Sequence, residues 1–299
     1  MKKVGIIGLG DMGIGLSRNL LKAGFPLTGC DLREERRNLL TEAGGQAVSS
    51  VGEVGECSDT VFVMVLNGKQ AQDVVGGEDG LAATMKAGST IIVSATIQPT
   101  EVRAVEKLLE GTGIHLIDSP VSGGKSGAEG GTLTMMAAAA KDVLDSQTDV
   151  LQAVGKDIFH VGEEIGMGQT VKASLQALIG STFTAIFESL VLGSKAGVPG
   201  KVLFDVFTSS GVRSPLLEGC SKLIMDREFK DTGSHIGTMY KDLGITMNMA
   251  RENGVAMFTT SSAYELFQSG ISLFPEEDNW SIVKLLEQIA DTEVTWDKK

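Results

Sequence analysis

The first thirty-one residues constrain the fold of this chain more than any other segment. Val4-Gly5-Ile6-Ile7 is a short apolar run, and Gly8-Leu9-Gly10-Asp11-Met12-Gly13 follows it directly. An amphipathic stretch from Ile14 to Lys22 comes next, and a second apolar run ends at Cys30-Asp31. This order predicts a strand, a glycine-rich turn, a helix and a second strand that ends on an acid.

The glycine motif has the chemistry of a dinucleotide-binding turn. Gly8 permits the tight turn, Gly10 lets a pyrophosphate approach the backbone, and Gly13 lets the helix pack closely on the strand. The start of the helix supplies free N–H groups and the positive end of a dipole. We therefore predict that residues 8–13 contact the cofactor. A glycine-rich loop with a purely structural role is the alternative.

Asp31 bears on which dinucleotide is bound. It stands about 20 residues after the glycines, where a carboxylate binds the ribose 2′-OH and repels a 2′-phosphate. NAD is therefore expected and NADP is disfavoured. Arg33, Arg36 and Arg37 follow closely. They are interpreted as solvated helix charges, and tolerance of a 2′-phosphate is the alternative.

Composition limits the classes of function. A chain of 299 residues is expected to form two domains, and a net charge of −12 argues against nucleic acid or an anionic membrane as a partner. The three cysteines, Cys30, Cys57 and Cys220, are too few and scattered for a disulfide framework or a zinc site. With no targeting segment recognised, we expect a cytoplasmic protein. The apolar stretch from Val171 to Leu192 contains Lys172, Gln176 and Glu188, which favours a buried helix over a membrane span.

The pattern along the chain changes near residue 165. The first part alternates strand-like and helix-like segments; the strand-like runs are 60–66, 90–94, 114–117 and 133–138, and 100–109 is helix-like. Such alternation predicts a parallel sheet with helices on both faces, with ligands at the carboxyl ends of the strands. The second part predicts only helices: 169–197, 201–208, 214–225, 239–253, 259–269 and 281–289. We therefore expect an α/β dinucleotide-binding domain over 1–165 and an all-helical domain over 166–299, with a cleft between them as the site.

Four further segments complete a recognisable set. They are Val93-Ser94-Ala95-Thr96-Ile97, Asp118-Ser119-Pro120-Val121-Ser122-Gly123-Gly124, residues 168–176 and Lys241-Asp242-Leu243-Gly244. With the N-terminal motif, and in this order, they resemble the β-hydroxyacid dehydrogenase family over essentially the whole chain. The resemblance implies a Rossmann domain, a long interdomain helix and an all-α C-terminal domain for substrate binding and dimerisation. An apolar residue at Val93 and an amide as long as Gln176 look most like the L-threonate dehydrogenase branch.

The resemblance also implies roles for individual residues. Lys172 matches the catalytic lysine of the family; without the resemblance, a side chain that reaches out to solvent is the alternative. Gln176 lies one helical turn further on the same face. Ser122, Gly123 and Gly124 correspond to the segment that holds the substrate carboxylate; without the resemblance an ordinary turn is the alternative. The implied substrate contacts further include Asp242, and the implied cofactor contacts are Val65, Leu66, Asn67, Thr96 and Lys241. A surface ion pair is the alternative for Lys241 and Asp242, and no metal site is expected from the three histidines.

The expected reaction is reversible, NAD-dependent oxidation of a short β-hydroxy acid to a semialdehyde or keto acid. Lys172 would take the hydroxyl proton, and Gln176 would hydrogen-bond the substrate hydroxyl or Lys172. A homodimer or homotetramer is expected. Two alternatives stay open: an NADPH-dependent reductase of glyoxylate or succinic semialdehyde, and a non-catalytic nucleotide-binding relative.

Overall fold

The chain folds into two compact units that meet inside one helix. The structure, a computed structural model, describes residues 1–297. The first unit is Met1–Lys172 and the second begins at Ala173. The division falls inside helix α10 (Met167–Lys195), a few residues beyond the expected boundary at residue 165. Lys172 therefore belongs to the first unit.

The first unit is built on one sheet. Its strands are β1 (Val4–Ile7), β2 (Leu27–Cys30), β3 (Gln46–Ala47), β4 (Thr60–Val63), β5 (Thr90–Val93), β6 (His115–Asp118), β7 (Val121–Ser122), β8 (Leu133–Ala138) and β9 (Gly155–Gly162). The order in space is β3-β2-β1-β4-β5-β6-β8-β7, with β9 also pairing with β8. The strands from β3 to β6 pair in parallel, and the order reverses direction at β1, which is the arrangement of a Rossmann fold.

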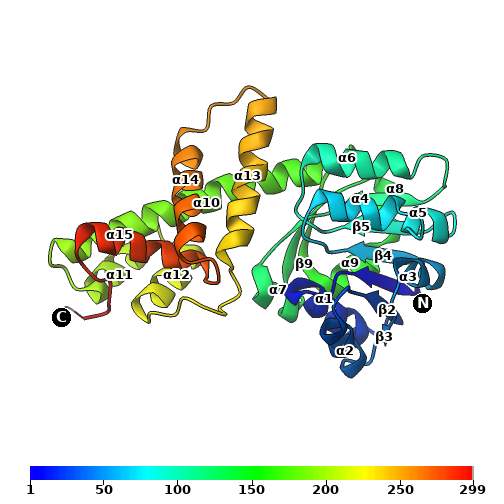
Figure 1. Cartoon of the computed structure of the whole chain (residues 1–299), viewed down its shortest axis with the longest axis horizontal. Helices are drawn as coiled ribbons and strands as arrows, with labels where there is room; N and C mark the ends of the chain where they lie inside the picture. The colour runs from blue at the N-terminus through cyan, green and yellow to red at the C-terminus, as the bar shows by residue number, and fades with distance from the viewer. Residues whose placement is uncertain (298–299) are drawn as a thin grey trace. The chain divides into compact units, whose positions relative to one another are not determined.

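Helices cover both faces of this sheet, as Figure 1 shows for α4 and α6 on one side and α1 and α2 on the other. The helices of the first unit are α1 (Asp11–Lys22), α2 (Glu34–Glu42), α3 (Val51–Cys57), α4 (Gly68–Gly76), α5 (Leu81–Thr84), α6 (Pro99–Leu108), α7 (Gly124–Gly130), α8 (Lys141–Ser146) and α9 (Thr148–Val154). Two hydrophobic clusters result, one centred on Ile6, Leu16 and Phe62 and the other on Val61, Ile91 and Val102. Alternate residues of the central strands enter opposite clusters, so these strands are apolar throughout.

Local sequence signals fix several helix starts. Ser50 caps α3 in a reciprocal pairing with Glu53, and Pro99 occupies the first turn of α6. Because these residues fix where each helix begins, they also fix where the preceding loop ends and how long it is.

The sheet is parallel from β3 to β6, as predicted, but it contains antiparallel pairs beyond β6. Strand β8 pairs antiparallel with β6 and β7, and β9 was not predicted at all. The predicted strand over 60–66 ends at Val63, because residues 64–67 form the loop that leads into α4.

The second unit is helical, as predicted. After α10 it contains α11 (Gly200–Ser209), α12 (Pro215–Met225), α13 (Ile236–Glu252), α14 (Phe258–Leu273), the short 3₁₀ helix Asn279–Ser281 and α15 (Ile282–Ala290). Its core forms a third cluster that includes Phe187, Leu243 and Phe267. Phe183 contributes two aromatic contacts, stacking on Phe187 and meeting Trp280 edge-on.

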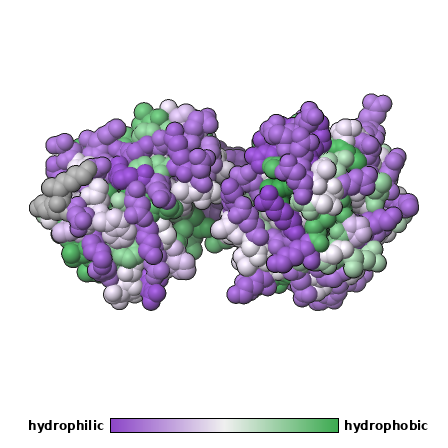
Figure 2. Space-filling view, turned by 90° about the horizontal axis from the view of Figure 1, so that it is seen from below, coloured by the Kyte–Doolittle hydropathy of each residue, from purple (hydrophilic) through white to green (hydrophobic). Residues whose placement is uncertain are grey.

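Helix α10 is covered along one side only. It is long and apolar enough to cross a membrane by length and composition, with mean hydropathy 1.5 over its most apolar window, of which 44% is buried. The core helix of a soluble protein passes the same test, so this is weak evidence for a span. The helix expected to be buried is buried on one side, while Val171, Leu178 and Leu192 on the other side are 39%, 66% and 72% exposed. Figure 2 shows one face of the surface, where hydrophilic residues predominate and apolar patches are separate.

Candidate active site

The glycine turn between β1 and α1 has the geometry that its sequence predicted. Gly8 has φ +94°, and a Cβ there would lie 2.2 Å from the carbonyl oxygen of Met64. A Cβ on Gly13 would lie 1.9 Å from the carbonyl oxygen of Gly8. Gly10 differs, because a Cβ there would meet no atom within 4 Å. Gly8 and Gly13 are therefore required by the fold, whereas nothing in the described protein requires a glycine at position 10.

Asp31 lies beside this turn at the end of β2. Its carboxylate accepts hydrogen bonds from the N–H groups of Leu9 (2.8 Å) and Arg33 (2.9 Å). Burial raises the pKa of Asp31, but these backbone hydrogen bonds and the Arg33 charge outweigh it and hold the pKa below its usual range. The carboxylate is thus ionised and fixed next to the glycines, as a ribose-binding acid must be.

Two further residues of the turn differ in exposure: Asp11 is exposed to solvent, and Met12 is partly buried. Asp11 is exposed at the start of α1, and its carboxylate forms an ion pair with Arg36 at 2.9 Å. Met12 packs against the first hydrophobic cluster. The pairing with Arg36 neutralises a negative charge at the helix start that would otherwise repel a phosphate.

The other predicted cofactor residues of the first unit follow β4 and β5. Val65, Leu66 and Asn67 form the loop after β4; Leu66 is 73% exposed, and the Asn67 side chain caps α4 by accepting from the Gln70 N–H. Thr96 lies in the loop between β5 and α6. Since neighbouring parallel strands end at the same edge, the structure brings residues 8–13, Asp31, 65–67 and Thr96 to one edge of the sheet.

The predicted carboxylate-binding segment joins β7 to α7. Ser122 ends β7 and is half-buried, while Gly123 and Gly124 are exposed. Their φ angles are +131° and +59°, a region of backbone conformation that favours glycine. The turn therefore depends on both glycines for its shape, in addition to any role in binding.

Lys172 and Gln176 occupy successive turns of α10. Both are buried, with 6% and 5% of their surface exposed. The Gln176 amide donates to the Asp242 carboxylate at 2.6 Å, and Lys241 Nζ lies 2.8 Å from the other Asp242 oxygen. Asp242 and Lys241 both lie on α13. Their ion pair is not a simple surface pair, because Asp242 is buried and also accepts from the buried Gln176 amide.

Two serines at the carboxyl ends of the strands were missed as candidates. Ser94 and Ser119 follow the paired residues Val93 and Asp118 on β5 and β6, and both hydroxyls are buried without a hydrogen-bond partner among the described residues. A serine directly after each apolar strand was the available signal. Arg213, in the loop before α12, is exposed and forms an ion pair with Glu218 at 2.7 Å.

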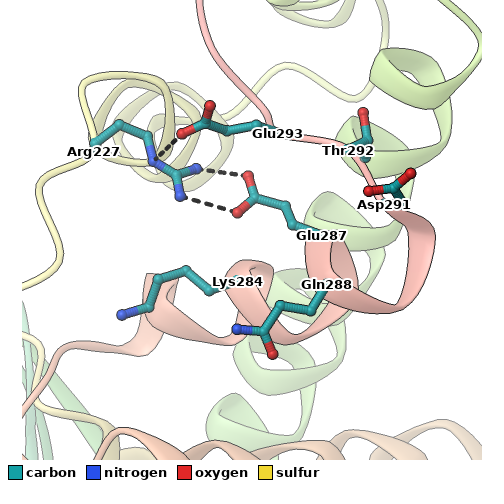
Figure 3. Close-up of a pocket in the computed structure, with 7 residues that line it drawn as sticks. All are labelled: Arg227, Lys284, Glu287, Gln288, Asp291, Thr292 and Glu293. Atoms are coloured by element: carbon teal, nitrogen blue, oxygen red, sulfur yellow. Dashed lines mark hydrogen bonds and ion pairs between the residues drawn. The ribbon is translucent and has the colours of Figure 1, made fainter.

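An open hollow of about 590 Å³ in the second unit is unrelated to these residues (Figure 3). Arg227 crosses it to form a double hydrogen bond with Glu287, and it lies 3.7 Å from Glu293. Glu287 also accepts from the Val294 N–H at 2.7 Å. This cluster attaches the C-terminal segment to α15, and its charges are already used in doing so.

Comparisons with known proteins also identify the part of the chain that contains the glycine turn as a dinucleotide-binding domain. Residues 3–162 match the model of the NAD-binding domain of 6-phosphogluconate dehydrogenase, and residues 166–286 match the model of the NAD-binding domain of NADP-dependent 3-hydroxyisobutyrate dehydrogenase. The chain belongs to the β-hydroxyacid dehydrogenase family. It is therefore an oxidoreductase with an NAD(P)-binding domain, and the family models do not separate the two cofactors.

Relatives of this family match over nearly the full chain. The chain is 33% identical to 2-(hydroxymethyl)glutarate dehydrogenase from Eubacterium barkeri, covering 98% of this chain and 97% of the relative. It is 32% identical to L-threonate dehydrogenase from Cupriavidus necator, covering 96% and 97%. The crystal structure of 3-hydroxyisobutyrate dehydrogenase from Salmonella typhimurium superimposes with a TM-score of 0.86 at 30% identity, covering 95% of this chain and 100% of that one.

Proposed function

We propose that this protein oxidises a short β-hydroxy acid reversibly to the semialdehyde or keto acid, with NAD as the hydride acceptor. The observation that carries the proposal is a buried lysine, Lys172, at the start of the long helix of a β-hydroxyacid dehydrogenase. A buried amine in the fold of a dehydrogenase is suited to proton transfer. This favours an enzyme over the non-catalytic relative.

The residues at the sheet edge fit a dinucleotide. The open space beside Gly10 leaves its backbone accessible to a pyrophosphate, and the fixed Asp31 carboxylate offers an acceptor to a ribose hydroxyl. The bound nicotinamide would supply the hydride chemistry. The protein's own task is to hold the substrate carbinol and to manage its proton.

Lys172 Nζ is the group that we assign to the substrate hydroxyl proton. Gln176, one turn further along α10, is held by Asp242 at 2.6 Å. Because its Nε2 is committed to that carboxylate, the amide oxygen of Gln176 is the atom left to accept from a substrate hydroxyl or from Lys172. Asp242 thereby fixes which end of the Gln176 amide faces the reacting groups.

The relatives favour a particular substrate class. The compounds in their names, 2-(hydroxymethyl)glutarate, L-threonate and 3-hydroxyisobutyrate, each carry a hydroxyl on the carbon β to a carboxylate. A screen of C3–C5 hydroxy acids, with NAD and NADP in parallel, tests the proposal. Reduction of glyoxylate or succinic semialdehyde with NADPH, with no oxidation of β-hydroxy acids, would support the rival reductase.

Ser122 gives a test of the carboxylate-binding segment. We expect Ser122→Ala to raise KM for the acid by about tenfold, because a hydrogen bond to a charged group contributes about 1.5 kcal/mol or more. The Kd for NAD should stay unchanged. Substituting Gly123 is a poorer test, since its φ of +131° strains any other residue. An unchanged KM in a folded Ser122→Ala protein would show that this serine only shapes the turn.

Asp31 gives a test of cofactor choice. We expect Asp31→Ser to narrow the ratio of kcat/KM for NAD over NADP by about tenfold or more, equivalent to about 1.4 kcal/mol of lost discrimination. The variant removes the carboxylate that repels a 2′-phosphate and leaves Arg33, Arg36 and Arg37 nearby. Steady-state kinetics with both cofactors measure the ratio. A parent protein that prefers NADP contradicts the assignment.

Self-association is also part of the proposal. Val171, Leu178 and Leu192 are separated by seven and fourteen residues along α10, multiples of a heptad, which places them on one exposed stripe. A second copy of the chain that packs against this stripe would bury these apolar side chains. The stripe therefore supports the homodimer or homotetramer that we expect from the family resemblance.

A further inference from the structure

Gln169, in the first turn of α10, bridges two other segments of the first unit. It is 1% exposed. Its Nε2 donates to the Ala95 carbonyl and to Asp118 Oδ1, each at 3.0 Å, and its Oε1 accepts from the Ile97 N–H at 3.0 Å. All the hydrogen-bonding groups of this amide side chain therefore act within the protein.

Asp118, at the end of β6, holds the start of the same helix. It is fully buried, and its Oδ2 accepts from the Gly166 N–H at 2.9 Å and the Gln169 N–H at 3.2 Å. Burial raises the pKa of Asp118 to about 6, against the lowering effect of the hydrogen bonds from Gln169 and Gly166. A Cβ on Gly168 would lie 2.6 Å from the Asp118 carbonyl oxygen, so the backbones are in close approach here.

The two ends of this bridge carry assigned residues. Ala95 and Ile97 flank Thr96, a predicted cofactor contact in the loop after β5, where we expect its hydroxyl to reach the nicotinamide side of the cofactor. Gln169 and Lys172 are three residues apart on α10, so they are neighbours on the helix surface. Neither Gln169 nor Asp118 needs to touch the substrate to affect both groups.

We propose that the Asp118–Gln169 pair is a positioning device that fixes the Thr96 loop and the Lys172 turn of α10 relative to each other. The pair would thus hold the loop that contacts the nicotinamide, which accepts the hydride, at a fixed distance from the Lys172 amine, which accepts the proton. This inference rests on the proposed function for its catalytic consequence, but the mechanical link is a property of the first unit alone.

The test exchanges the chemistry of the pair. In Gln169→Glu a carboxylate faces Asp118 Oδ1 and the Ala95 carbonyl, so acceptors oppose acceptors. In Asp118→Asn an amide NH₂ faces the Gln169 NH₂, so donors oppose donors. In the double variant the new amide at position 118 can donate to the new carboxylate at position 169. The oxygen of that amide still accepts from the backbone N–H groups of residues 166 and 169, and only the bond to Ala95 stays lost.

Gln147 provides the matched control. It is also a buried glutamine that bridges two strands, accepting from Thr60 Oγ1 at 2.8 Å and donating to Thr90 Oγ1 at 3.1 Å. Thr60 and Thr90 begin β4 and β5, so this bridge lies at the opposite edge of the sheet from the site. Gln147→Glu thus introduces a comparable disturbance away from the proposed chemistry.

We expect each single change of the pair to lower kcat by about 10- to 100-fold, since a misplacement of about 1 Å costs about 10² in rate. The Kd for NAD, from quenching of protein fluorescence, should change by less than about threefold, a difference below about 0.7 kcal/mol. The double variant should recover about tenfold in kcat over either single variant. Gln147→Glu should lower Tm while leaving kcat within about twofold of the parent.

Hydrogen exchange gives a readout that needs no activity. In the unliganded protein, amide protection at Ile97, Gly166 and position 169 should fall together in each single variant and should be unchanged in Gln147→Glu. If Gln169→Glu does not fold, Gln169→Met removes the same hydrogen bonds without repulsion and is judged by the same criteria. A parental kcat in folded single variants overturns the proposal, as does an equal loss of kcat in Gln147→Glu. An inactive parent with coupled loss of protection would instead contradict the proposed function and leave the mechanical link intact.

Discussion

Lys172→Met is expected to lower kcat for hydroxy-acid oxidation by about 10² to 10⁴, the usual contribution of general acid–base catalysis. Methionine keeps the length and helix propensity of lysine but cannot carry a proton. The lysine is 6% exposed, so an apolar replacement adds no burial cost. Stopped-flow or steady-state formation of NADH measures kcat, and the Kd for NAD should be nearly unchanged.

The pH profile separates loss of the proton acceptor from general damage. Oxidation needs the unprotonated amine, so kcat of the parent should rise with pH, and this rising limb should be absent in Lys172→Met. Lys195→Met is the control, because Lys195 ends the same helix and its exposed amine donates to the Asp291 carbonyl. If Lys172→Met keeps more than about half of the parental kcat, the proton is transferred elsewhere and the mechanism has to be abandoned.

Local features of the site could be predicted from the sequence. The roles of Gly8 and Gly13 depend on contacts within one strand–turn–helix unit, and the structure shows both close approaches. Asp31 comes directly after the next strand, β2, only a short distance along the chain. Because these residues interact with near neighbours in sequence, a motif with fixed spacing specifies their geometry.

Features that depend on distant partners could not be predicted. Strand β9 has an exposed Phe159 and charged residues Lys156 and Asp157, so it lacks the apolar run that identifies a buried strand; its formation depends on pairing with β8. The sequence predicted that Gln176 would hydrogen-bond the substrate hydroxyl or Lys172, but it did not indicate that Asp242, on another helix, binds the amide nitrogen of Gln176. The sequence motif gives the residue type, while the partner sets the direction of the side chain.

Gly10→Val is expected to weaken NAD binding by about 100-fold, a loss of about 2.7 kcal/mol, while the protein still folds. Gly10 has φ −60° and ψ −173°, which any residue can adopt, and its Cβ position is open. The loss of an N-cap glycine should cost the unliganded protein about 1 kcal/mol at most. Titration of NAD measures Kd, and thermal unfolding without cofactor measures stability.

Two other glycines make this result decisive. Gly219 on α12 also has open space around its Cβ position, so Gly219→Val should bind NAD as the parent does. Gly13→Ala should behave in the opposite way, because its Cβ would lie 1.9 Å from the Gly8 carbonyl oxygen and the unliganded fold itself would lose stability. Of these three glycines, Gly10 alone combines an empty Cβ position with a predicted role in cofactor binding. A Gly10→Val protein that binds NAD within about threefold of the parent, a difference below about 0.7 kcal/mol, would mean that the pyrophosphate does not approach this turn. The assignment of the cofactor to the carboxyl end of β1 would then be wrong, whatever the fold resembles.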